Sequence, residues 1–341
     1  MAKVKVENFL TQTLHERSFM NHQTDVAPRC GYVGILGKPN AGKSTLLNGF
    51  IGQKLAGVSA KAQTTRNKIL GIDVVDGCQM IFLDTPGIHN SHQHIRMNKL
   101  MNDAAWSILA DADYMLYLID CRVGIKDDDI DFLKKVLTSA NCPVEVILSK
   151  SDSIKKFLVR ESSEKTTEVL KKLSLDPTLT KGKDFLVSTT PTLLSAKRPT
   201  ELSTFKQELA PKLPEGPFLY GEDELTDKSQ KFVVSELVRE HTFRQLGDEI
   251  PYGVTVVTDK IDEKEKIVHV DATIIAEREA HKPIIIGKNG SRIKKIGMDS
   301  RTSLEQHFEK KVMLDLFVKV ESGWIQNEKL IEQLQGITEQ D

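Results

Sequence analysis

The chain has 341 residues, enough for two compact domains that each bury a core of their own. Charged side chains make up 28% of the residues, yet they nearly cancel and leave a formal net charge of −1. This balance argues against a protein that coats itself with nucleic acid, so an RNA site has to be a local basic patch. The four cysteines form no CxxC motif or Cys/His cluster, which argues against a zinc site. No apolar run reaches the roughly 18–20 residues that span a bilayer, so we expect a cytoplasmic protein.

Residues 1–27 are polar and of mixed charge, without the apolar core of a signal peptide, and are expected to form an N-terminal extension. Residues 28–212 then alternate short apolar runs with amphipathic stretches. Strands are expected at Tyr32–Leu36, Met80–Leu83, Tyr114–Ile119 and Val144–Leu148, and helices at Lys43–Phe50, Asn98–Ala110 and Ile130–Ser139. Continuous apolar strands separated by helices indicate an α/β domain whose parallel sheet is covered on both faces. We assign no element to Thr178–Thr192.

The segment Pro211–Gly221 carries three prolines and two glycines, so residues 213–226 are expected to link this domain to a second one at 227–330. In the second domain we expect a helix at Asp227–Leu246, strands at Gly253–Asp259 and Lys266–Ala276, a helix at Ser300–Phe308 and a strand at Val312–Val320. This order is typical of an α+β domain. Residues 331–341 are expected to form a C-terminal tail.

A phosphate-binding loop is predicted at Gly37–Ser44, which satisfies the pattern GxxxxGK[ST] directly after an apolar strand and before a helix. Its glycines let backbone N–H groups surround the phosphates, and the helix N-terminus adds its positive dipole. Lys43 is expected to reach the β- and γ-phosphates, and the Ser44 hydroxyl to coordinate Mg²⁺. The candidate site comprises Gly37, Lys38, Pro39, Asn40, Ala41, Gly42, Lys43, Ser44 and Thr45.

The second strong strand ends in Asp84-Thr85-Pro86-Gly87, with Ile88 next. A carboxylate at this tip lies beside the phosphate-binding loop in such a sheet, so Asp84 is expected to hold Mg²⁺, and Gly87 can turn its N–H toward the γ-phosphate. Between the two motifs lies the predicted switch segment, Gln63-Thr64-Thr65-Arg66. The hydroxyl of Thr64 or of Thr65 can complete the Mg²⁺ shell only while a γ-phosphate is present.

Base recognition is predicted at Ser149-Lys150-Ser151-Asp152, which closes the strand Val144–Leu148. The carboxylate of Asp152 can accept hydrogen bonds from both the N1–H and the N2 amine of guanine, a pair that adenine lacks, which favours GTP over ATP. Lys150 is expected to lie along the base and the phosphate-binding loop. A second base loop is expected at Ser195-Ala196-Lys197, with the Ala196 N–H facing guanine O6; Ser188-Thr189-Thr190 is its rival.

An RNA site is predicted in the second domain at Ile286-Gly287-Lys288-Asn289-Gly290, which contains the pattern IGxxG before a basic helix start. Such a turn lets the backbone approach the phosphates of a short single strand, and a neighbouring apolar groove holds the bases. Basic side chains gather around the turn and provide the local patch that the net charge hides: Lys288, Arg292, Lys294 and Lys295.

Together these motifs resemble those of the Era family of bacterial GTPases, from Gly31 to Trp324. Gly37–Asn48 is similar to the family's GxPNxGKSTLLN, and Lys61–Arg66, Asp84–Ile88 and Gly287–Gly290 fall in the family's order. The resemblance implies a TrmE-Era-type P-loop GTPase domain with a mixed, mainly parallel sheet, followed by a type II KH domain. It also implies slow GTP hydrolysis linked to maturation of the 30S ribosomal subunit, and binding of the single-stranded 3′ end of 16S ribosomal RNA. We expect a monomer; peripheral association at the cytoplasmic face of the cell membrane stays open.

Two positions bear on nucleotide binding and hydrolysis. The family's NKxD motif begins with an asparagine that holds the base loop against the phosphate-binding loop, whereas Ser149 is shorter and can supply only part of that support. Where many switch GTPases have a glutamine that orients water, this chain has Ile88, whose side chain cannot do so. The resemblance implies a monovalent-cation route, in which Asn40 helps to coordinate K⁺ near the β- and γ-phosphates. His89 is the second candidate for contact with water.

Two other functions are alternatives for parts of this sequence. A P-loop kinase for a small metabolite predicts an arginine-rich lid and no guanine-reading carboxylate such as Asp152, and neither expectation fits. A C-terminal protein-docking domain, in contrast, places a partner protein under the control of GTP and binds no RNA.

Overall fold

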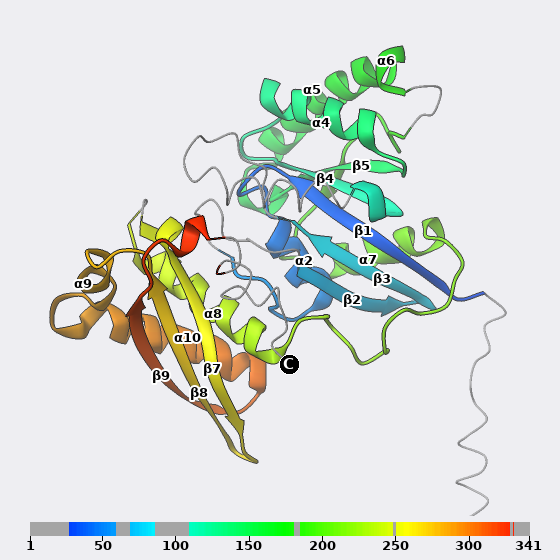
Figure 1. The fold of residues 1–341 in the computed structure, drawn as a ribbon. Helices are drawn as coiled ribbons and strands as arrows, with labels where there is room; N and C mark the ends of the chain where they lie inside the picture. Colours follow the sequence, from blue (N-terminus) through cyan, green and yellow to red (C-terminus); the bar gives the residue numbers. More distant parts are fainter. Residues whose placement is uncertain are drawn as a thin grey trace, which may run out of the picture.

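The computed structural model describes residues 27–58, 69–85, 109–180, 185–247, 250–327 and 330. They form an α/β domain and an α+β domain joined by an extended segment, so the predicted fold class is confirmed (Figure 1). Several predicted features lie outside the described residues. These are nearly all of the N-terminal extension, Gln63–Arg66, Pro86–Ile88, His89, most of the helix Asn98–Ala110 and the C-terminal tail.

The α/β domain is built on a six-stranded sheet in the order β2-β3-β1-β4-β5-β6. Its strands are β1 (Arg29–Gly37), β2 (Ile69–Val75), β3 (Cys78–Asp84), β4 (Tyr114–Asp120), β5 (Val144–Ser149) and β6 (Thr192–Leu194). Strand β2 runs antiparallel to β3, and every other neighbouring pair is parallel. The carboxyl ends of β1, β3, β4 and β5 therefore meet at one edge, which is where open α/β sheets bind ligands.

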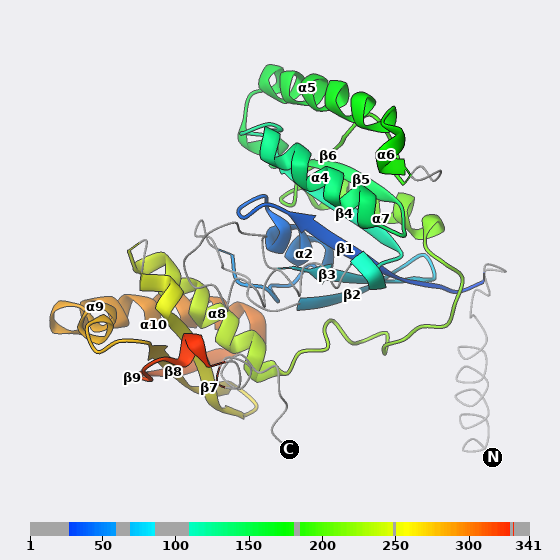
Figure 2. The ribbon, with the colours of Figure 1, turned by 45° about the horizontal axis from the view of Figure 1, so that its top comes forward.

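Helices cover both faces of this sheet, as predicted (Figure 2). Helices α2 (Lys43–Ile51) and α7 (Pro199–Leu209) pack on one face through side chains such as Phe50 and Phe205. Helices α4 (Asp127–Ser139) and α5 (Lys156–Ser174) pack on the other through side chains such as Leu133 and Leu170. The short helix α6 (Pro177–Thr180) contacts α4 and α5.

All four strands predicted for this domain are confirmed, with bounds that differ by a few residues. Five further elements, β2, α5, α6, β6 and α7, have no counterpart in the prediction. Gly71 interrupts the apolar pattern of β2, and a Cβ there would lie 2.7 Å from Cδ1 of Leu47. The buried side of α5 begins with two polar residues, Ser162 and Thr166, before it becomes apolar at Leu170. A helix whose buried side is partly polar has a weak apolar periodicity, so the sequence pattern does not reveal it.

The α+β domain packs two helices on one face of a three-stranded sheet. Its elements in chain order are α8 (Gln230–Gln245), β7 (Val254–Glu263), β8 (Ile267–Ala276), α9 (His281–Ile286), α10 (Ser291–Phe308) and β9 (Lys311–Val320). Strands β7 and β8 are antiparallel, and β8 and β9 are parallel. The order α–β–β–α–α–β is the one expected of a type II KH domain. Helix α10 runs from Ser291 to Phe308, so it joins the expected basic helix start after the glycine turn to the predicted helix Ser300–Phe308, with Gly297 inside it.

Between the domains, residues 213–226 lie along the edge of the first sheet. Glu215 pairs with Arg29 at 3.0 Å, the N–H of Leu219 donates to the side chain of Gln79 at 2.8 Å, and the N–H of Ile72 in β2 donates to the carbonyl of Leu225 at 2.9 Å. Figure 2 shows the segment passing β2 on its way to α8. The linker is therefore held along its length by the α/β domain.

Helix α8 is also in contact with the α/β domain. The loop after α2 inserts Leu55, which is 2% exposed, into the core of the second domain beside Leu237 and Val238. The side chain of Asn48 shapes this loop, because it accepts hydrogen bonds of 2.9 Å from the N–H groups of both Leu55 and Ala56. This contact explains why α8 is buried on nearly every side, with polar residues facing the first domain.

Candidate functional site

The phosphate-binding loop connects β1 to α2 and needs its glycines. The φ angle of Gly37 is +147° and that of Gly42 is +101°, values that L side chains rarely adopt. A Cβ on Gly37 would also lie 2.6 Å from the carbonyl oxygen of Leu118. The loop therefore has a backbone shape that requires glycine at both positions.

Inside this loop lies the ammonium group of Lys43. It donates to the carbonyls of Gly37 and Lys38, both at 3.0 Å, and the side chain is buried. Burial lowers the pKa of Lys43 to about 8; nearby Lys150 lowers it too, while Asp84 acts in the opposite direction. A phosphate group would supply the negative charge that compensates for this burial.

The two predicted Mg²⁺ ligands meet at the tips of α2 and β3. The Ser44 hydroxyl donates to Oδ2 of Asp84 at 2.6 Å, and Asp84 is completely buried. Thr85 fixes the turn after β3, since its hydroxyl donates to the carbonyl of Ile35 at 3.0 Å. A hydroxyl and a carboxylate oxygen are the ligand types that Mg²⁺ prefers, so the donor set fits this ion. Pro86, Gly87, Ile88 and the switch segment Gln63–Arg66 lie outside the described residues.

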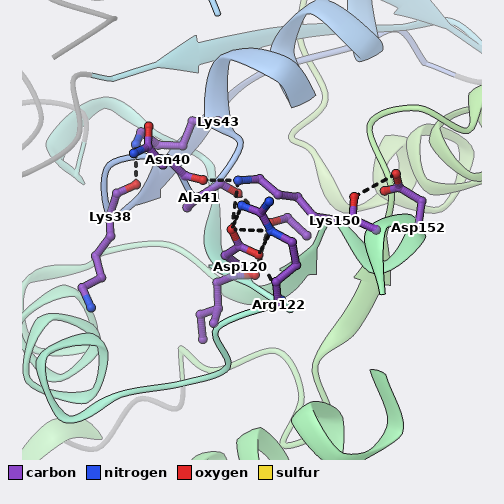
Figure 3. A network of polar contacts seen from close by, with 11 residues as sticks. Lys38, Asn40, Ala41, Lys43, Asp120, Arg122, Lys150 and Asp152 are labelled. Carbon is purple, nitrogen blue, oxygen red and sulfur yellow. Dashed lines mark hydrogen bonds and ion pairs between the residues drawn. The ribbon is translucent and has the colours of Figure 1, made fainter. Parts of the chain in front are cut away.

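Two side chains hold the phosphate-binding loop from outside, and Lys38 of the loop itself holds it to α4. Ser149 Oγ donates to the carbonyl of Ala41 at 2.5 Å, so the serine does support the loop. Lys150 Nζ donates to the carbonyl of Asn40. Lys38 reaches the start of α4 and pairs with Asp128 and Asp129 at 2.5 and 3.1 Å. Figure 3 shows Lys38 extending away from the loop and Lys150 reaching toward it from the other side.

The predicted base loops come together because β5 and β6 are neighbours in the sheet. The Ser195 hydroxyl donates to Oδ1 of Asp152 at 2.7 Å, and Lys197 Nζ lies 3.8 Å from Oδ2. These contacts, the bond from Ser195 first, lower the pKa of Asp152, so the carboxylate is ionised. In the rival stretch, Ser188 accepts a local hydrogen bond from the N–H of Thr190. The geometry therefore favours Ser195–Lys197 as the partner of Asp152.

The GxxG turn lies between α9 and α10. A Cβ on Gly287 would lie 2.7 Å from Cβ of Arg292, whereas no atom comes within 4 Å of the position on Gly290. The turn is thus tightly packed on its inner side and open at Gly290. Lys288 and Lys294 are exposed, while Arg292 donates to the carbonyl of Ile284 and Lys295 pairs with Asp299 at 2.7 Å.

Asp120 and Arg122 lie beside the predicted base-recognition residue Lys150, although no motif in the sequence marks them. Both contact the group around Lys150 (Figure 3). The available signal is that Asp120 is an acid at the end of a buried strand, next to β1 in the sheet. Within the described ranges no group of three or more His, Cys, Asp or Glu is placed to hold a metal ion. None of the described helices is long and apolar enough to cross a membrane.

Comparison with known proteins agrees with this geometry. Residues 32–150 match the family described as 50S ribosome-binding GTPase, and residues 249–325 match the KH domain. The GTPase Era of Pseudomonas aeruginosa strain LESB58 is 39% identical over 316 residues, which cover 92% of this chain and 97% of that protein. The GTPase Era of Azotobacter vinelandii is 39% identical over 306 residues, covering 90% and 96%.

Two solved structures are similar over nearly the whole chain. A variant of Aquifex aeolicus Era bound to GDP and AlF4− superposes with a TM-score of 0.77 at 32% identity, covering 90% of this chain and 98% of that one. Era in complex with MgGDPNP and nucleotides 1506–1542 of 16S ribosomal RNA gives a TM-score of 0.77 at 31% identity, with the same coverage. The chain belongs to the Era family of GTPases.

Proposed function

We propose that this chain is a GTP-hydrolysing switch that binds the single-stranded 3′ end of 16S ribosomal RNA and assists maturation of the 30S subunit. The proposal rests on one observation: three groups of functional residues lie at the same edge of the sheet. The phosphate-binding loop around Lys43, the Ser44–Asp84 pair and the Asp152–Ser195 pair all follow the carboxyl ends of neighbouring strands. An Era complex with RNA nucleotides 1506–1542 of 16S ribosomal RNA, similar over 90% of this chain, supports the second half.

Guanine recognition belongs to Asp152 and Ser195–Lys197 in this proposal. The ionised carboxylate of Asp152 accepts from N1–H and the N2 amine of the base, and Ser195 keeps it oriented for both bonds. The N–H of Ala196 donates to guanine O6. Adenine offers no such pair to the carboxylate and presents an amine toward Ala196, so GTP is selected over ATP.

Phosphate binding and hydrolysis belong to residues 37–45 and the tips of β3 and α2. Backbone N–H groups of the loop and the Lys43 ammonium hold the β- and γ-phosphates, as expected of helix N-termini. Ser44 and Asp84 hold Mg²⁺, which neutralises charge on the phosphate oxygens when bound; an Era structure with MgGDPNP supports this. Asn40, at the top of the loop with φ of 64°, is assigned to K⁺. The positive charge of K⁺ near the leaving group lowers the barrier to GTP hydrolysis. Turnover is nevertheless slow, because Ile88 cannot orient water.

RNA binding belongs to the GxxG turn and the exposed lysines beside it. The open side of Gly290 lets the backbone approach a phosphate, and Lys288 and Lys294 supply positive charge there. Replacement of Gly287 is a poor test, because any Cβ there collides with Arg292 and disturbs the turn itself. Exposed Lys288 can be changed without that collision.

The test is therefore Lys288→Asp against Lys266→Asp, an identical charge change at the exposed β7–β8 turn, the other end of strand β8. The ligand is a labelled single-stranded RNA with the sequence of the 3′ end of 16S ribosomal RNA. We expect Lys288→Asp to weaken RNA binding about tenfold or more, with unchanged GTP turnover, and Lys266→Asp to change neither. Equal RNA binding by both variants and the unaltered protein would favour a protein-docking domain. Failure of the unaltered protein to select GTP over ATP would refute the GTPase assignment.

A further inference from the structure

The carboxylate of Asp120 holds two cations at the end of β4. Its Oδ2 accepts from Lys150 Nζ at 2.9 Å and from a terminal nitrogen of Arg122 at 2.7 Å, and its Oδ1 accepts from Arg122 Nε at 3.0 Å. The backbone N–H of Arg122 donates to the same Oδ1 at 3.0 Å. The Asp120 side chain is 12% exposed, so this is a nearly enclosed, fully hydrogen-bonded carboxylate. The bidentate contact fixes its orientation.

Asp120 directs the side chain of Lys150 across the phosphate-binding loop. Asp120 lies opposite Ser149 in the β4–β5 pairing, which brings its carboxylate to the residue after that strand. From there Lys150 Nζ also donates to the carbonyl of Asn40 (Figure 3). A Cβ on Gly42 would lie 3.4 Å from Cε of Lys150, so the methylene chain runs against the loop. Without Asp120, only the Asn40 carbonyl would keep this long side chain from turning toward solvent.

Ser149 leaves much of the support of the loop to other residues. Its hydroxyl lies 2.5 Å from the carbonyl of Ala41 and 3.2 Å from that of Ile119. A hydroxyl has a single proton, so it can donate to one of these carbonyls at a time, whereas an asparagine amide has two donors and an acceptor. Lys150, the residue after strand β5, makes a further contact with the loop through the carbonyl of Asn40.

We propose that Asp120 and Arg122 are positioning residues for the guanine nucleotide, which fix Lys150 between the base and the phosphate-binding loop and so compensate for the serine at position 149. The inference rests on the proposed function, since it assumes that this loop holds a nucleotide. Arg122 acts through Asp120: it neutralises the carboxylate and locks its rotamer, while 46% of its own side chain stays exposed. Neither residue is assigned a contact with the phosphates.

A purely structural ion pair predicts a different behaviour. In that case, loss of Asp120 would lower the stability of the protein without nucleotide and leave nucleotide affinity as it was. If Asp120 positions Lys150, its loss should instead weaken nucleotide binding and leave the stability of the nucleotide-free protein as it was. The reason is that Lys150 has to be in place only when the base and phosphates bind. The serine allows a second test. With an asparagine at position 149, loss of Asp120 should weaken nucleotide binding less.

The experiment compares Asp120→Asn, Arg122→Gln, Ser149→Asn and the double variant Asp120→Asn with Ser149→Asn in the full chain. Arg160→Gln, which removes an exposed pair with Glu164 at 2.7 Å on α5, is the control for loss of an arginine. The probes are fluorescent GDP for affinity and release, GTP for KM and kcat, and thermal unfolding without nucleotide.

We expect Asp120→Asn to weaken GDP binding about tenfold, through faster release, and to raise KM more than it lowers kcat. Arg122→Gln should have a smaller effect in the same direction, and Arg160→Gln none. The double variant should recover most of the lost affinity. Unchanged GDP affinity in Asp120→Asn, or an undiminished loss in the double variant, would overturn the proposal. Absence of GDP binding by the unaltered protein would instead overturn the proposed function on which it rests.

Discussion

The carboxylate of Glu240 in α8 accepts a hydrogen bond of 2.9 Å from the backbone N–H of Val58 in the α/β domain. Arg244, one turn further along α8, donates to the carbonyl of Val58 at 3.1 Å. Lys54 also pairs with Glu240 at 2.8 Å, and the Glu240 side chain is fully buried. Both backbone polar groups of Val58 are therefore held by the KH domain, shortly before the predicted switch Gln63–Arg66. This contact therefore joins the α/β domain to the KH domain at a residue that precedes the predicted switch in the sequence.

Glu240→Gln removes the buried negative charge that Lys54 and Arg244 share. We expect the free energy of unfolding to fall by about 1–2 kcal/mol, because both cations are partly exposed and water replaces part of the lost interaction. Urea unfolding of the full chain measures this. The control is Glu263→Gln, which breaks the exposed pair with Lys310 at 2.6 Å and should lower stability less than Glu240→Gln does. Equal effects of the two variants would contradict a special role for Glu240.

The same variant also tests communication between the domains. If the Glu240–Val58 bond connects the switch to α8, RNA affinity should depend less on the bound nucleotide in Glu240→Gln than in the unaltered protein. The measurement is RNA binding with a non-hydrolysable GTP analogue and with GDP. A lower stability together with an unchanged nucleotide dependence would show that the contact only holds the domains together.

The stability of the KH domain should fall in mild acid because of two histidines, the buried His241 and the half-buried His307. Burial lowers the pKa of His241 and of His307 below the ordinary value of 6.5. Around His241, Glu240 and Asp299 favour the protonated ring, whereas Lys54 and Arg244 oppose it. The unfolded chain therefore binds more protons than the folded one below pH 6.5, and stability present above that pH is lost as the pH falls through the folded pKa values.

We predict that the free energy of unfolding falls between pH 7.5 and pH 5.5, measured by urea unfolding. His241→Gln together with His307→Gln should reduce this slope. His241 Nε2 lies 2.8 Å from the hydroxyl of Ser303, a contact that glutamine can restore in part. A slope equal to that of the unaltered protein would exclude these histidines as its cause.

The residues that could be predicted from the sequence are those whose chemistry is local. The phosphate-binding loop and the GxxG turn each consist of a few consecutive residues between two elements. Their sequence pattern is therefore enough to predict their local structure. Ser195–Lys197 could be predicted only as one of two alternatives, because its neighbour Asp152 is joined to it through the β5–β6 pairing. That pairing depends on the fold.

Contacts between distant residues could not be predicted in this way. Glu240 and Val58 are 182 positions apart, and Lys150 and Asn40 are 110 apart. Each pair exists because two elements with ordinary periodicity pack together, and a glutamate or lysine in such a helix or loop is usually a solvated residue. Helix α5 shows the same limit at the level of the fold, since its buried side begins with Ser162 and Thr166.

Asp152→Asn should change which base the protein prefers. In guanine the carboxylate of Asp152 meets two donors, N1–H and the N2 amine, whereas xanthine has a carbonyl in place of that amine. An asparagine amide can accept from N1–H and donate to this carbonyl. We expect GTP affinity to fall about a hundredfold and XTP affinity to rise above that for GTP, measured by competition with fluorescent GDP. Ser153→Ala, which removes a weaker contact of 3.2 Å with Asp152, is the control and should keep the preference for GTP.

GTP turnover should be faster in K⁺ than in Na⁺ at equal ionic strength, by about tenfold, which corresponds to about 1.4 kcal/mol of barrier. Asn40 is the residue assigned to the cation, and its φ of 64° decides which variants are informative. Alanine at this position would be strained, whereas glycine adopts the angle freely and removes the oxygen, and aspartate tolerates it and keeps an oxygen. We therefore expect Asn40→Gly to turn over GTP at equal rates in the two salts and Asn40→Asp to retain the K⁺ preference. Equal rates in the two salts for the unaltered protein would refute the cation route and direct attention to His89.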